Sequence, residues 1–364
     1  MGYKTLHYLT SFLDLNKAFD CLNHEILLRK LFVYNFHPQS IALIMSYLSE
    51  RYQHVKINNL KSSDSKITHG VPQGSILGPL LFLLFINDIP DSIEDADVTL
   101  YADDTTVGVS NINLFEVIEQ SSAVLNRVSN WFNTNRLCLN EEKSIHMLFT
   151  LKSHDLPESY QSETKSLGLI IDNKLMWHQQ GEYISKKLNK SCFFLRYLTG
   201  SISRDLIRTA YFALFHSHLN YGILIWGHST IRHRIFSLQR KAVRIVAGLC
   251  YRDDCHRAFI EHKIFTLPCL FIYRCLEYVK TNLKQFHILG TEHVYLTRNH
   301  HIKHNNLRLS KSKNGVSYYG IKFFNVVPIH VRSLSEQQFL KIVKSYLIQK
   351  AFYTLEEFMN SKFE

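Results

Sequence analysis

The stretch Tyr101-Ala102-Asp103-Asp104 lies between two short, apolar, β-prone runs. Two such runs separated by a tight polar turn predict a β-hairpin with the carboxylates at its tip. A purely structural hairpin would more naturally carry Asn-Gly or Asp-Gly there, because these pairs adopt the backbone angles of tight turns. Adjacent Asp side chains repel each other. The pair therefore indicates either a solvated turn or a site for a metal ion.

A third carboxylate, Asp14, lies near the end of an apolar run from Leu6 to Leu15 that predicts a buried strand. If this strand is a neighbour of the hairpin, Asp14, Asp103 and Asp104 converge at one edge of a sheet. Mg²⁺ prefers oxygen ligands and keeps several waters, so a few carboxylates with substrate phosphates complete its coordination. Two such ions ~3.5–4 Å apart would stabilise both the attacking and the leaving oxygens of a phosphoryl displacement.

The order of predicted elements indicates an α+β protein. Up to residue 177 strands and helices are mixed, whereas from about residue 178 the pattern is mostly helical. We expect helices at 24–31 (capped by Asn23), 39–50, 80–86 (opened by Gly78-Pro79), 114–133, 183–198, 204–218 and 231–247, strands at 53–58, 144–151 and 165–171, and a turn-rich loop at 70–75.

The two halves of the chain carry opposite charge. Residues 1–180 hold 14 Lys and Arg against 20 Asp and Glu, whereas residues 181–364 hold 28 against 11. An acidic half joined to a basic half predicts an acidic site beside a surface that binds a polyanion. The alternative is a basic surface with no partner.

The seven Cys residues are odd in number and include no CxxC pair, so they predict neither a disulfide framework nor a zinc module. Free thiols in a reducing compartment are the expected state. No signal peptide is visible at the start. The longest apolar run, residues 80–86, is far shorter than the ~20 residues that cross a bilayer, and predicts a buried helix.

Taken together, these stretches resemble the reverse transcriptases of non-LTR (LINE-type, jockey-like) retrotransposons. The motifs follow one another in the family's order, and the resemblance covers nearly the whole chain. Palm motifs A, B and C correspond to residues 12–20 (FLDLNKAFD), 70–79 (GVPQGSILGP) and 101–104 (YADD), motif D to 139–144 (LNEEKS), motif E to 167–172 (LGLIID) with Trp177, and the thumb and C-terminal region to 226–248 and 318–325.

The resemblance implies a right-hand polymerase fold. It assigns residues 1–177 to a palm with partial fingers, built on an antiparallel sheet with helices. Residues 178–249 would form a helical thumb, and residues 250–364 a mixed, basic C-terminal region of unknown role. The implied activity is RNA-directed DNA synthesis, in which a primer 3′-hydroxyl attacks a deoxynucleotide on an RNA template.

The resemblance also implies roles for single residues at the reaction centre. Asp14 and Asp103 would ligate two Mg²⁺ ions, with Mn²⁺ as the alternative metal, and Asp104 would assist. The Leu15 carbonyl would be a further ligand. Lys143 would lie near the leaving pyrophosphate as a general acid, although a lysine in a Glu-Glu-Lys run is also typical of a solvated surface.

Three further residues would contact the incoming nucleotide. Phe19 would lie under the sugar as a steric gate against a 2′-hydroxyl; its alternative is a core aromatic. Gln73 and Gly74 would lie against the nucleotide and the template base, and glycine would allow close approach of the backbone. The alternative for this loop is a simple tight turn. Asp20 is equally consistent with a helix cap.

The basic helices after residue 178 would follow the phosphate backbone of a template–primer duplex. Such contacts release counterions and give salt-dependent binding without sequence preference. An RNA–DNA hybrid would be recognised mainly by its shape and backbone. The expected partners are an RNA template, a DNA primer and dNTP, with no membrane. The basic residues we expect to bind nucleic acid are Lys186, Lys187, Lys190, Arg240, Lys241 and Arg244.

The chain departs from the family pattern before motif A. Asp14 is only 13 residues from the start, so the fingers strands that contact the triphosphate are missing, and we expect a 5′-truncated copy. The alternative is a catalytically inactive, nucleic-acid-binding remnant. Phe19, and Ala102 where RNA-dependent RNA polymerases typically have Gly, argue against that enzyme class. The resemblance implies the nucleus, with the cytoplasm as the other compartment.

Overall fold

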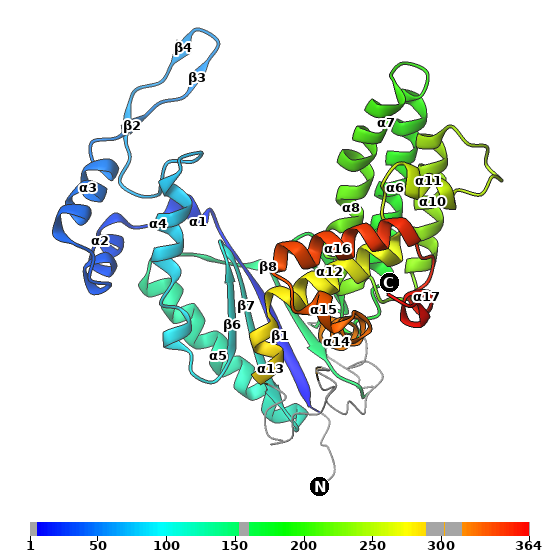
Figure 1. Cartoon of the computed structure of the whole chain (residues 1–364). Helices are drawn as coiled ribbons and strands as arrows, with labels where there is room; N and C mark the ends of the chain where they lie inside the picture. Colours follow the sequence, from blue (N-terminus) through cyan, green and yellow to red (C-terminus); the bar gives the residue numbers. More distant parts are fainter. Residues whose placement is uncertain (1–5, 153–159, 289–301, 303–314, 364) are drawn as a thin grey trace. The chain divides into compact units, whose positions relative to one another are not determined.

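The computed structural model describes residues 6–152, 160–288, 302 and 315–363 and divides the chain into two compact units. The first unit covers residues 1–175 and the second covers residues 176–364 (Figure 1). The predicted domain boundary after residue 177 lies close to this division, and the further boundary at 249/250 stays a prediction.

The first unit is built on a four-stranded antiparallel sheet with the strand order β6-β7-β1-β8. Strand β1, which ends one residue after Asp14, lies between β7 and β8. The expectation that this strand neighbours the hairpin is therefore confirmed, as is the α+β class. The strands are β1 (His7–Leu15), β6 (Asp97–Tyr101), β7 (Asp104–Asn111) and β8 (Leu139–Phe149).

Helices accompany this sheet. Those predicted at 24–31 and 114–133 begin at the expected residue, whereas the one predicted at 80–86 begins earlier, at Leu77. The Asn23 side chain accepts a hydrogen bond from the Ile26 amide (3.0 Å), which satisfies one of the free N–H groups at the start of its helix. The helical elements are α1 (Ala18–Cys21), α2 (His24–Val33), α3 (Pro38–Leu48), α4 (Leu77–Ile86), η1 (Pro90–Ser92) and α5 (Leu114–Thr134).

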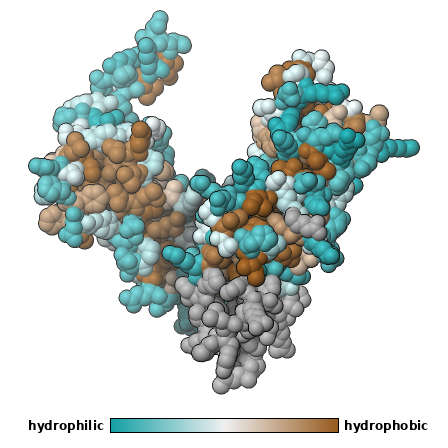
Figure 2. All heavy atoms as spheres, viewed as in Figure 1, coloured by the Kyte–Doolittle hydropathy of each residue, from teal (hydrophilic) through white to brown (hydrophobic). Residues whose placement is uncertain are grey.

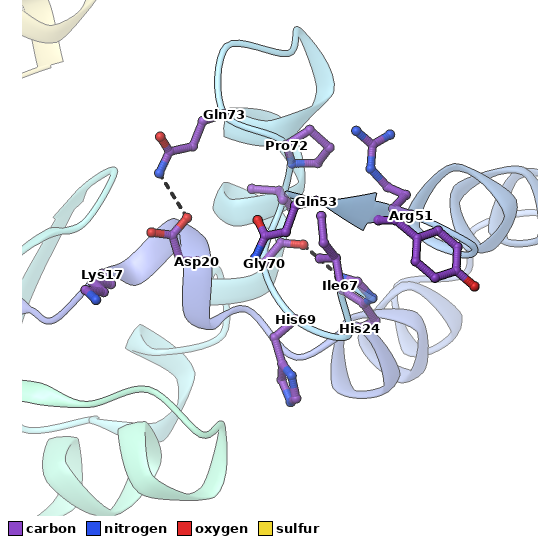
Figure 3. Close-up of a pocket in the computed structure, with 12 residues that line it drawn as sticks. Lys17, Asp20, His24, Arg51, Gln53, Ile67, His69, Gly70, Pro72 and Gln73 are labelled. Atoms are coloured by element: carbon purple, nitrogen blue, oxygen red, sulfur yellow. Dashed lines mark hydrogen bonds between the residues drawn. The ribbon is translucent and has the colours of Figure 1, made fainter. Parts of the chain in front are cut away.

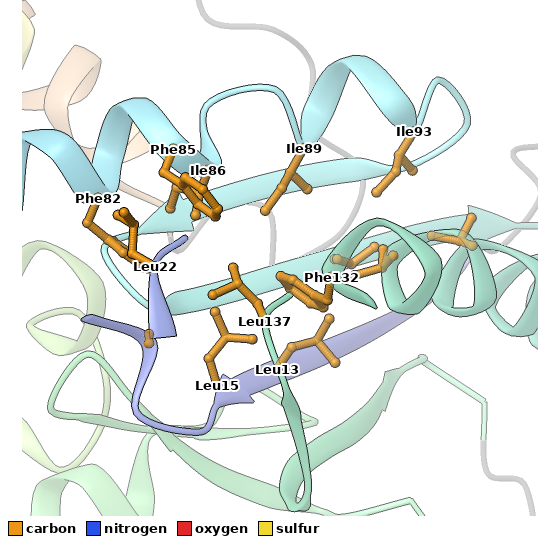
Figure 4. Close-up of a cluster of buried hydrophobic side chains, with 14 of the residues drawn as sticks. Leu13, Leu15, Leu22, Phe82, Phe85, Ile86, Ile89, Ile93, Phe132 and Leu137 are labelled. Carbon is orange, nitrogen blue, oxygen red and sulfur yellow. The ribbon is translucent and has the colours of Figure 1, made fainter. Parts of the chain in front are cut away.

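A single apolar cluster joins these helices to the sheet (Figure 4). Leu13 of β1, Phe82 and Phe85 of α4 and Phe132 of α5 are almost completely buried in it. Each such side chain contributes roughly 1.5–3 kcal/mol by leaving water. Because Leu13 directly precedes Asp14, the cluster holds the start of the carboxylate site in place.

The strand predicted at residues 53–58 is wrong. The structure has two short hairpin ladders in its place, which pair β2 with β5 and β3 with β4. All the residues in these strands are exposed, so no buried face stabilises a continuous strand. The strands are β2 (Tyr52–Gln53), β3 (Lys56–Ile57), β4 (Leu60–Lys61) and β5 (Ser65–Lys66).

The strand predicted at residues 165–171 is also wrong, because the chain reverses within it. Leu167 and Gly168 both have positive φ, 46° and 80°, and form the turn of a hairpin. The two antiparallel strands on either side are β9 (Glu163–Ser166) and β10 (Leu169–Asp172). The glycine in the middle of the run was the local signal for this turn.

The second unit, as far as the structure describes it, consists of helices. The predicted helix at 204–218 contains a π-helical turn, η2. The described helical elements of the second unit are α6 (His178–Leu198), α7 (Arg204–Tyr211), η2 (Phe212–His216), α8 (Ser217–Asn220), α9 (Ile223–Trp226), α10 (Arg232–Ala247), α11 (His256–Glu261), α12 (Leu267–Thr281), α13 (Leu283–Ile288), α14 (Val316–Val326), α15 (Ile329–Arg332), α16 (Glu336–Lys350) and α17 (Leu355–Asn360).

The surface of the first unit carries exposed apolar side chains on α2, α3 and α4. Figure 2 shows apolar area over this part of the unit. The exposed apolar residues on α2, α3 and α4 include Phe32, Val33, Leu43, Met45, Leu80 and Leu83.

None of the described helices is both long and apolar enough to cross a membrane. All seven cysteines are free thiols.

Candidate active site

The sheet brings the three predicted carboxylates to one end of its central strands. The last residue pair between β1 and β7 is Leu13 with Thr105, so Asp14 and Asp104 are the next residues along their strands. Asp104 also pairs with Tyr101 of β6 and is therefore the first residue of β7. Only Asp103, with Ala102, lies in the turn itself, so the expectation of both carboxylates at the tip is corrected.

Asp104 lies in an excess of negative charge. Its pKa is raised above the ordinary carboxyl value, first by partial burial and then by the charges of Asp103 and Asp14. A divalent cation would relieve this repulsion, and oxygen donors are those that Mg²⁺ prefers. Within the described residues, however, no three acidic, His or Cys side chains are close enough together to enclose a metal ion. The donors fit such an ion by their chemistry and charge.

A bulge in β8 places Lys143 beside Asp14. Phe12 pairs with Ile145 but Asp14 pairs with Asn140, so four residues of β8 lie opposite Leu13 alone. Bulges of this kind redirect side chains and are common beside active sites. The Lys143 Nζ lies 3.7 Å from the Asp14 Oδ2, and its side chain is 71% exposed. An ion pair this exposed contributes roughly 0–1 kcal/mol, so it positions Lys143 more than it stabilises the fold.

The loop at residues 70–75 is held against α1 by backbone hydrogen bonds. The Gly70 amide donates to the Leu22 carbonyl (2.7 Å), and the Val71 amide donates to the Phe19 carbonyl (2.9 Å). Gly70 has φ +82°, and a Cβ there would lie 2.7 Å from the Asp20 carbonyl oxygen. Only glycine fits this approach, which therefore keeps the loop and α1 together.

Gln73 and Asp20 point toward one another across this contact (Figure 3). The Gln73 Nε2 donates to the Asp20 Oδ1 at 2.9 Å. Asp20 lies within α1 and caps neither helix, since α1 begins after Lys17 and α2 is capped by Asn23. Gly74 has φ +77°, but a Cβ there would meet nothing within 4 Å. At position 74, glycine is favoured by the backbone angle and not by close contact with another part of the protein.

Phe19 lies half-buried at the side of the apolar cluster. Its ring packs on Phe82, with 4.5 Å between the centroids and 32° between the planes. This contact fixes the ring and makes it part of the core edge. A ring held in this way is also a rigid wall for whatever lies beside it, so the core and steric-gate interpretations are compatible.

A cavity of about 660 Å³ adjoins α1 and the 70–75 loop. Its lining includes the basic residues Lys17 and Arg51, together with His69, Asp20 and Gln73 (Figure 3). The sequence analysis missed Lys17, Arg51 and His69. Lys17 has φ +47°, a left-handed conformation that is uncommon for a lysine and is a local signal of a functional site. Nothing local marks Arg51, since the fold alone brings it to this cavity.

Helix α6 carries the exposed part of the predicted nucleic-acid surface. Lys186 and Lys190 are exposed, and Phe193 and Tyr197 follow on the same side at helical spacing, also exposed. Lys187 instead lies half-buried, with its Nζ over a neighbouring tyrosine ring. The exposed aromatic residues were missed, although their spacing from the lysines is visible in the sequence.

The three basic residues predicted on α10 are all half-buried. Arg240 lies over the ring of Phe236, with its guanidinium carbon 5.4 Å from the ring centroid. Arg244 donates from its Nε to the Asp253 carbonyl (2.7 Å) and so holds the loop that follows α10. Lys241 is partly covered as well. Two of these side chains thus have local structural contacts, unlike the exposed lysines of α6.

Comparison with known proteins gives consistent matches. Residues 3–171 match the family model described as reverse transcriptase (RNA-dependent DNA polymerase). The chain is similar to the RNA-directed DNA polymerase from mobile element jockey of Drosophila melanogaster, with 28% identity over 65% of this chain and 28% of that protein. It is also similar to the probable RNA-directed DNA polymerase from transposon X-element of the same organism, with 29% identity over 68% and 29% of the two chains.

The chain spans less than a third of the length of these curated relatives. Among solved structures, it is similar to telomerase from Candida tropicalis in complex with a fragment of telomeric RNA. The TM-score is 0.38 and the identity 14%, over 80% of this chain and 50% of that chain. Telomerase from Candida albicans gives a TM-score of 0.35.

Proposed function

We propose, from the match of residues 3–171 to the reverse transcriptase family model and the similarity to the two Drosophila polymerases, that the chain is the polymerase part of a non-LTR retrotransposon, which synthesises DNA on an RNA template in the nucleus. The observation that carries this proposal is that Asp14 and Asp104 lie at the same end of adjacent strands, with Asp103 in the turn directly before Asp104. In the same proposal the first unit is the palm with partial fingers, residues 178–249 are the thumb, and residues 250–364 form a C-terminal region.

Asp14, Asp103 and Asp104 would hold the divalent cations, Mg²⁺ or Mn²⁺, with the Leu15 carbonyl as a further ligand. When bound, such ions activate the primer hydroxyl and neutralise charge on the transferred phosphoryl group. The raised pKa of Asp104 supports this assignment, because partial burial, and then the charges of Asp103 and Asp14, disfavour its ionised form, and a bound cation would favour it.

Lys143 is the proposed proton donor to the leaving pyrophosphate. Its distance of 3.7 Å from Asp14 keeps the ammonium group close to the reacting phosphates while leaving it exposed to them. A general acid of this kind typically contributes a factor of about 10² to 10⁴ to the rate.

Phe19, Gln73 and Gly74 are the proposed nucleotide contacts. The packing of Phe19 on Phe82 keeps the ring from moving away from a 2′-hydroxyl. The hydrogen bond from Gln73 to Asp20 orients the Gln73 amide. A pre-oriented contact loses less entropy when the substrate binds.

Lys17, Arg51 and His69 would bind phosphates of the template strand in their cavity. A volume of about 660 Å³ is sufficient for a nucleotide, and two permanent cations attract its phosphate.

Helix α6 would contact the template–primer duplex. Lys186 and Lys190 would neutralise backbone phosphates, and Phe193 and Tyr197 would lie against sugars or exposed bases. For Lys187, Arg240, Lys241 and Arg244 the partial burial favours a supporting role, in which they contribute positive potential from behind this surface.

Primer extension on an RNA template with Mg²⁺ tests the proposal. We expect Asp103→Ala to reduce extension by about 100-fold or more, because it removes charge stabilisation at the reacting phosphate. Asp91→Asn, on the exposed η1 turn, is the matched control and should extend like the wild type. If the wild type is as inactive as Asp103→Ala while both bind the duplex, the chain is a nucleic-acid-binding protein and not a polymerase.

A further inference from the structure

A separate cavity of about 390 Å³ lies within the second unit, among α7, η2, α12, α16 and the segment after α11. Its lining contains four Lys and Arg side chains and no Asp or Glu. Aromatic rings and His216 complete its walls. The four cations are Arg208, Lys263, Arg274 and Lys344.

The protein itself neutralises only part of this charge. Arg274 forms an ion pair with Glu277 (Nη1 to Oε2, 2.5 Å). Arg208 is held by a hydrogen bond from its Nε to the His262 carbonyl (2.7 Å), which fixes its direction without removing its charge. Among the described residues, Lys263 and Lys344 form no ion pair. The cavity therefore keeps a positive excess that an anion would balance.

Lys263 occupies a backbone position that normally requires glycine. It follows the end of α11 with φ +52°, and the Lys263 amide donates to the Ile260 carbonyl (3.1 Å) while the Ile264 amide donates to the Phe259 carbonyl (2.8 Å). This is the Schellman arrangement of a helix end, in which glycine is usual. A lysine in this left-handed conformation is strained, and residues held in such conformations are enriched at functional sites.

The π-helical turn η2 is a second irregularity at the same cavity. Phe212 and His216 both belong to it and both line the cavity. Single π-helical turns within α-helices are frequent at functional sites. In addition, the His216 Nδ1 is buried and has no hydrogen-bond partner within the described part of the chain.

The aromatic part of the wall is formed by Phe265 and Tyr273. Their rings pack with 5.2 Å between centroids and 31° between planes. A ring at such a wall offers a face on which a nucleic-acid base stacks, whatever the base is. The volume of about 390 Å³ falls in the usual range for a small-molecule site, roughly 300–1,000 Å³.

We propose that this cavity binds one nucleotide unit of a single-stranded nucleic acid. Its phosphate lies against Arg208, Lys263 and Lys344, and its base lies on the ring of Tyr273. Cations alone would serve any anion, but cations beside an aromatic wall fit a phosphate that carries a planar base. The site shares no residue with the carboxylates or with the α6 surface, so it does not depend on the polymerase assignment.

Equilibrium binding of UMP to the full chain, followed by calorimetry, tests the site. We expect Lys263→Gly to weaken UMP binding about tenfold, as loss of one charge-assisted contact does, while thermal stability stays equal or rises because the strain is relieved. Tyr273→Leu should also lower the affinity about tenfold, through loss of stacking. Lys344→Ala should weaken binding, whereas Lys341→Ala, an exposed lysine one turn earlier on α16 and outside the cavity lining, should not.

The controls separate this site from general attraction of anions. Inorganic phosphate should displace UMP only at much higher concentration, and an octanucleotide of single-stranded RNA or DNA should compete with it. Equal effects of Lys341→Ala and Lys344→Ala would assign the binding to overall surface charge and overturn the proposal. If phosphate competes as well as UMP does, the cavity binds anions without recognising the base. If UMP binding is unchanged in Lys263→Gly and Tyr273→Leu, the nucleotide does not bind in this cavity.

Discussion

The ion pair between Lys30 and Asp88 illustrates how much a single residue depends on its surroundings. Lys30 donates from its Nζ to the Asp88 Oδ1 (2.6 Å) and the Phe85 carbonyl (2.8 Å), and its side chain is only 12% exposed. Burial lowers the pKa of Lys30, and Asp88 opposes that change. Asp88 follows the end of α4 by two residues, and its side chain remains 33% exposed while it forms this pair.

Removing the Asp88 carboxylate should lower the free energy of unfolding more than replacing Lys30 with an uncharged side chain. We expect Asp88→Ala to lower the free energy of unfolding by about 2–4 kcal/mol, since it leaves Lys30 as an uncompensated, buried cation. Lys30→Met keeps the apolar contact with the surrounding rings, and its effect should be within about 1 kcal/mol. Urea unfolding measures both. Equal, small losses would show that solvent screens the pair.

Gly70 and Gly74 both have positive φ, yet they should respond differently to alanine. Gly70→Ala places a methyl group against the Asp20 carbonyl and should break the docking of the loop on α1, with a large loss of primer extension. Gly74→Ala has open space and carries only the backbone strain, about 1–2 kcal/mol. Unfolding and extension assays on the two variants separate them. A larger stability loss in Gly74→Ala would contradict the close approach at Gly70.

At the level of elements, the bulge in β8 connects strand pairing to chemistry. We expect Lys143→Ala to lower the extension rate by a factor of about 10² or more, because a positioned proton donor is lost. Its unfolding free energy should change by less than about 0.5 kcal/mol, since the side chain is exposed. Single-turnover extension and urea unfolding measure the two quantities. Lys143→Arg is the control that retains the charge, and an unchanged rate in Lys143→Ala would exclude the proton-donor role.

The π-helical turn η2 should make the second unit sensitive to acid. Burial, and then the charge of Arg274, lower the pKa of His216 to about 4 in the folded chain, whereas the unfolded value is about 6.5. Because the unfolded state then binds the proton first, stability falls as the pH drops below about 6.5 and levels off below about 4. The full effect of this one group is about 3 kcal/mol.

Urea unfolding at pH 7, 5.5 and 4.5, followed by the fluorescence of the buried Trp226, measures this dependence. His216→Asn should reduce the slope without abolishing it, since His228 has a lowered pKa for the same main reason. The same slope in His216→Asn and in the wild type would show that His216 does not titrate differently on folding.

At the scale of the whole molecule, the exposed apolar area on α2, α3 and α4 bears on how the protein associates. Phe32 is 72% and Leu43 is 71% exposed. Contiguous apolar surface of this kind favours association. We expect Phe32→Lys with Leu43→Gln to reduce light scattering of the concentrated protein, with thermal stability unchanged because neither side chain is buried. Unaltered scattering would show that these helices do not mediate association.

Much of the site could be predicted from sequence because it is encoded in short stretches. Local composition predicts the strands on both sides of Asp103-Asp104 and the strand that contains Asp14. The strand that carries Asp14 is confirmed as a neighbour of the hairpin. The predictions failed at residues 53–58 and 165–171, where the apolar pattern was not produced by one continuous buried face.

The sequence by itself thus determined the α+β class, the resemblance to reverse transcriptases over residues 3–171, and the strands and turn that carry the carboxylates, since motif chemistry and periodicity lie within a few neighbouring residues. Only the tertiary structure decided that Lys143 lies beside Asp14, that Gly70 fits against α1, that Lys30 pairs with Asp88, and that Lys263 and Tyr273 line one cavity. These relations join segments that are far apart along the chain or depend on strand register. Register and packing are set by the whole core, and no local pattern records them.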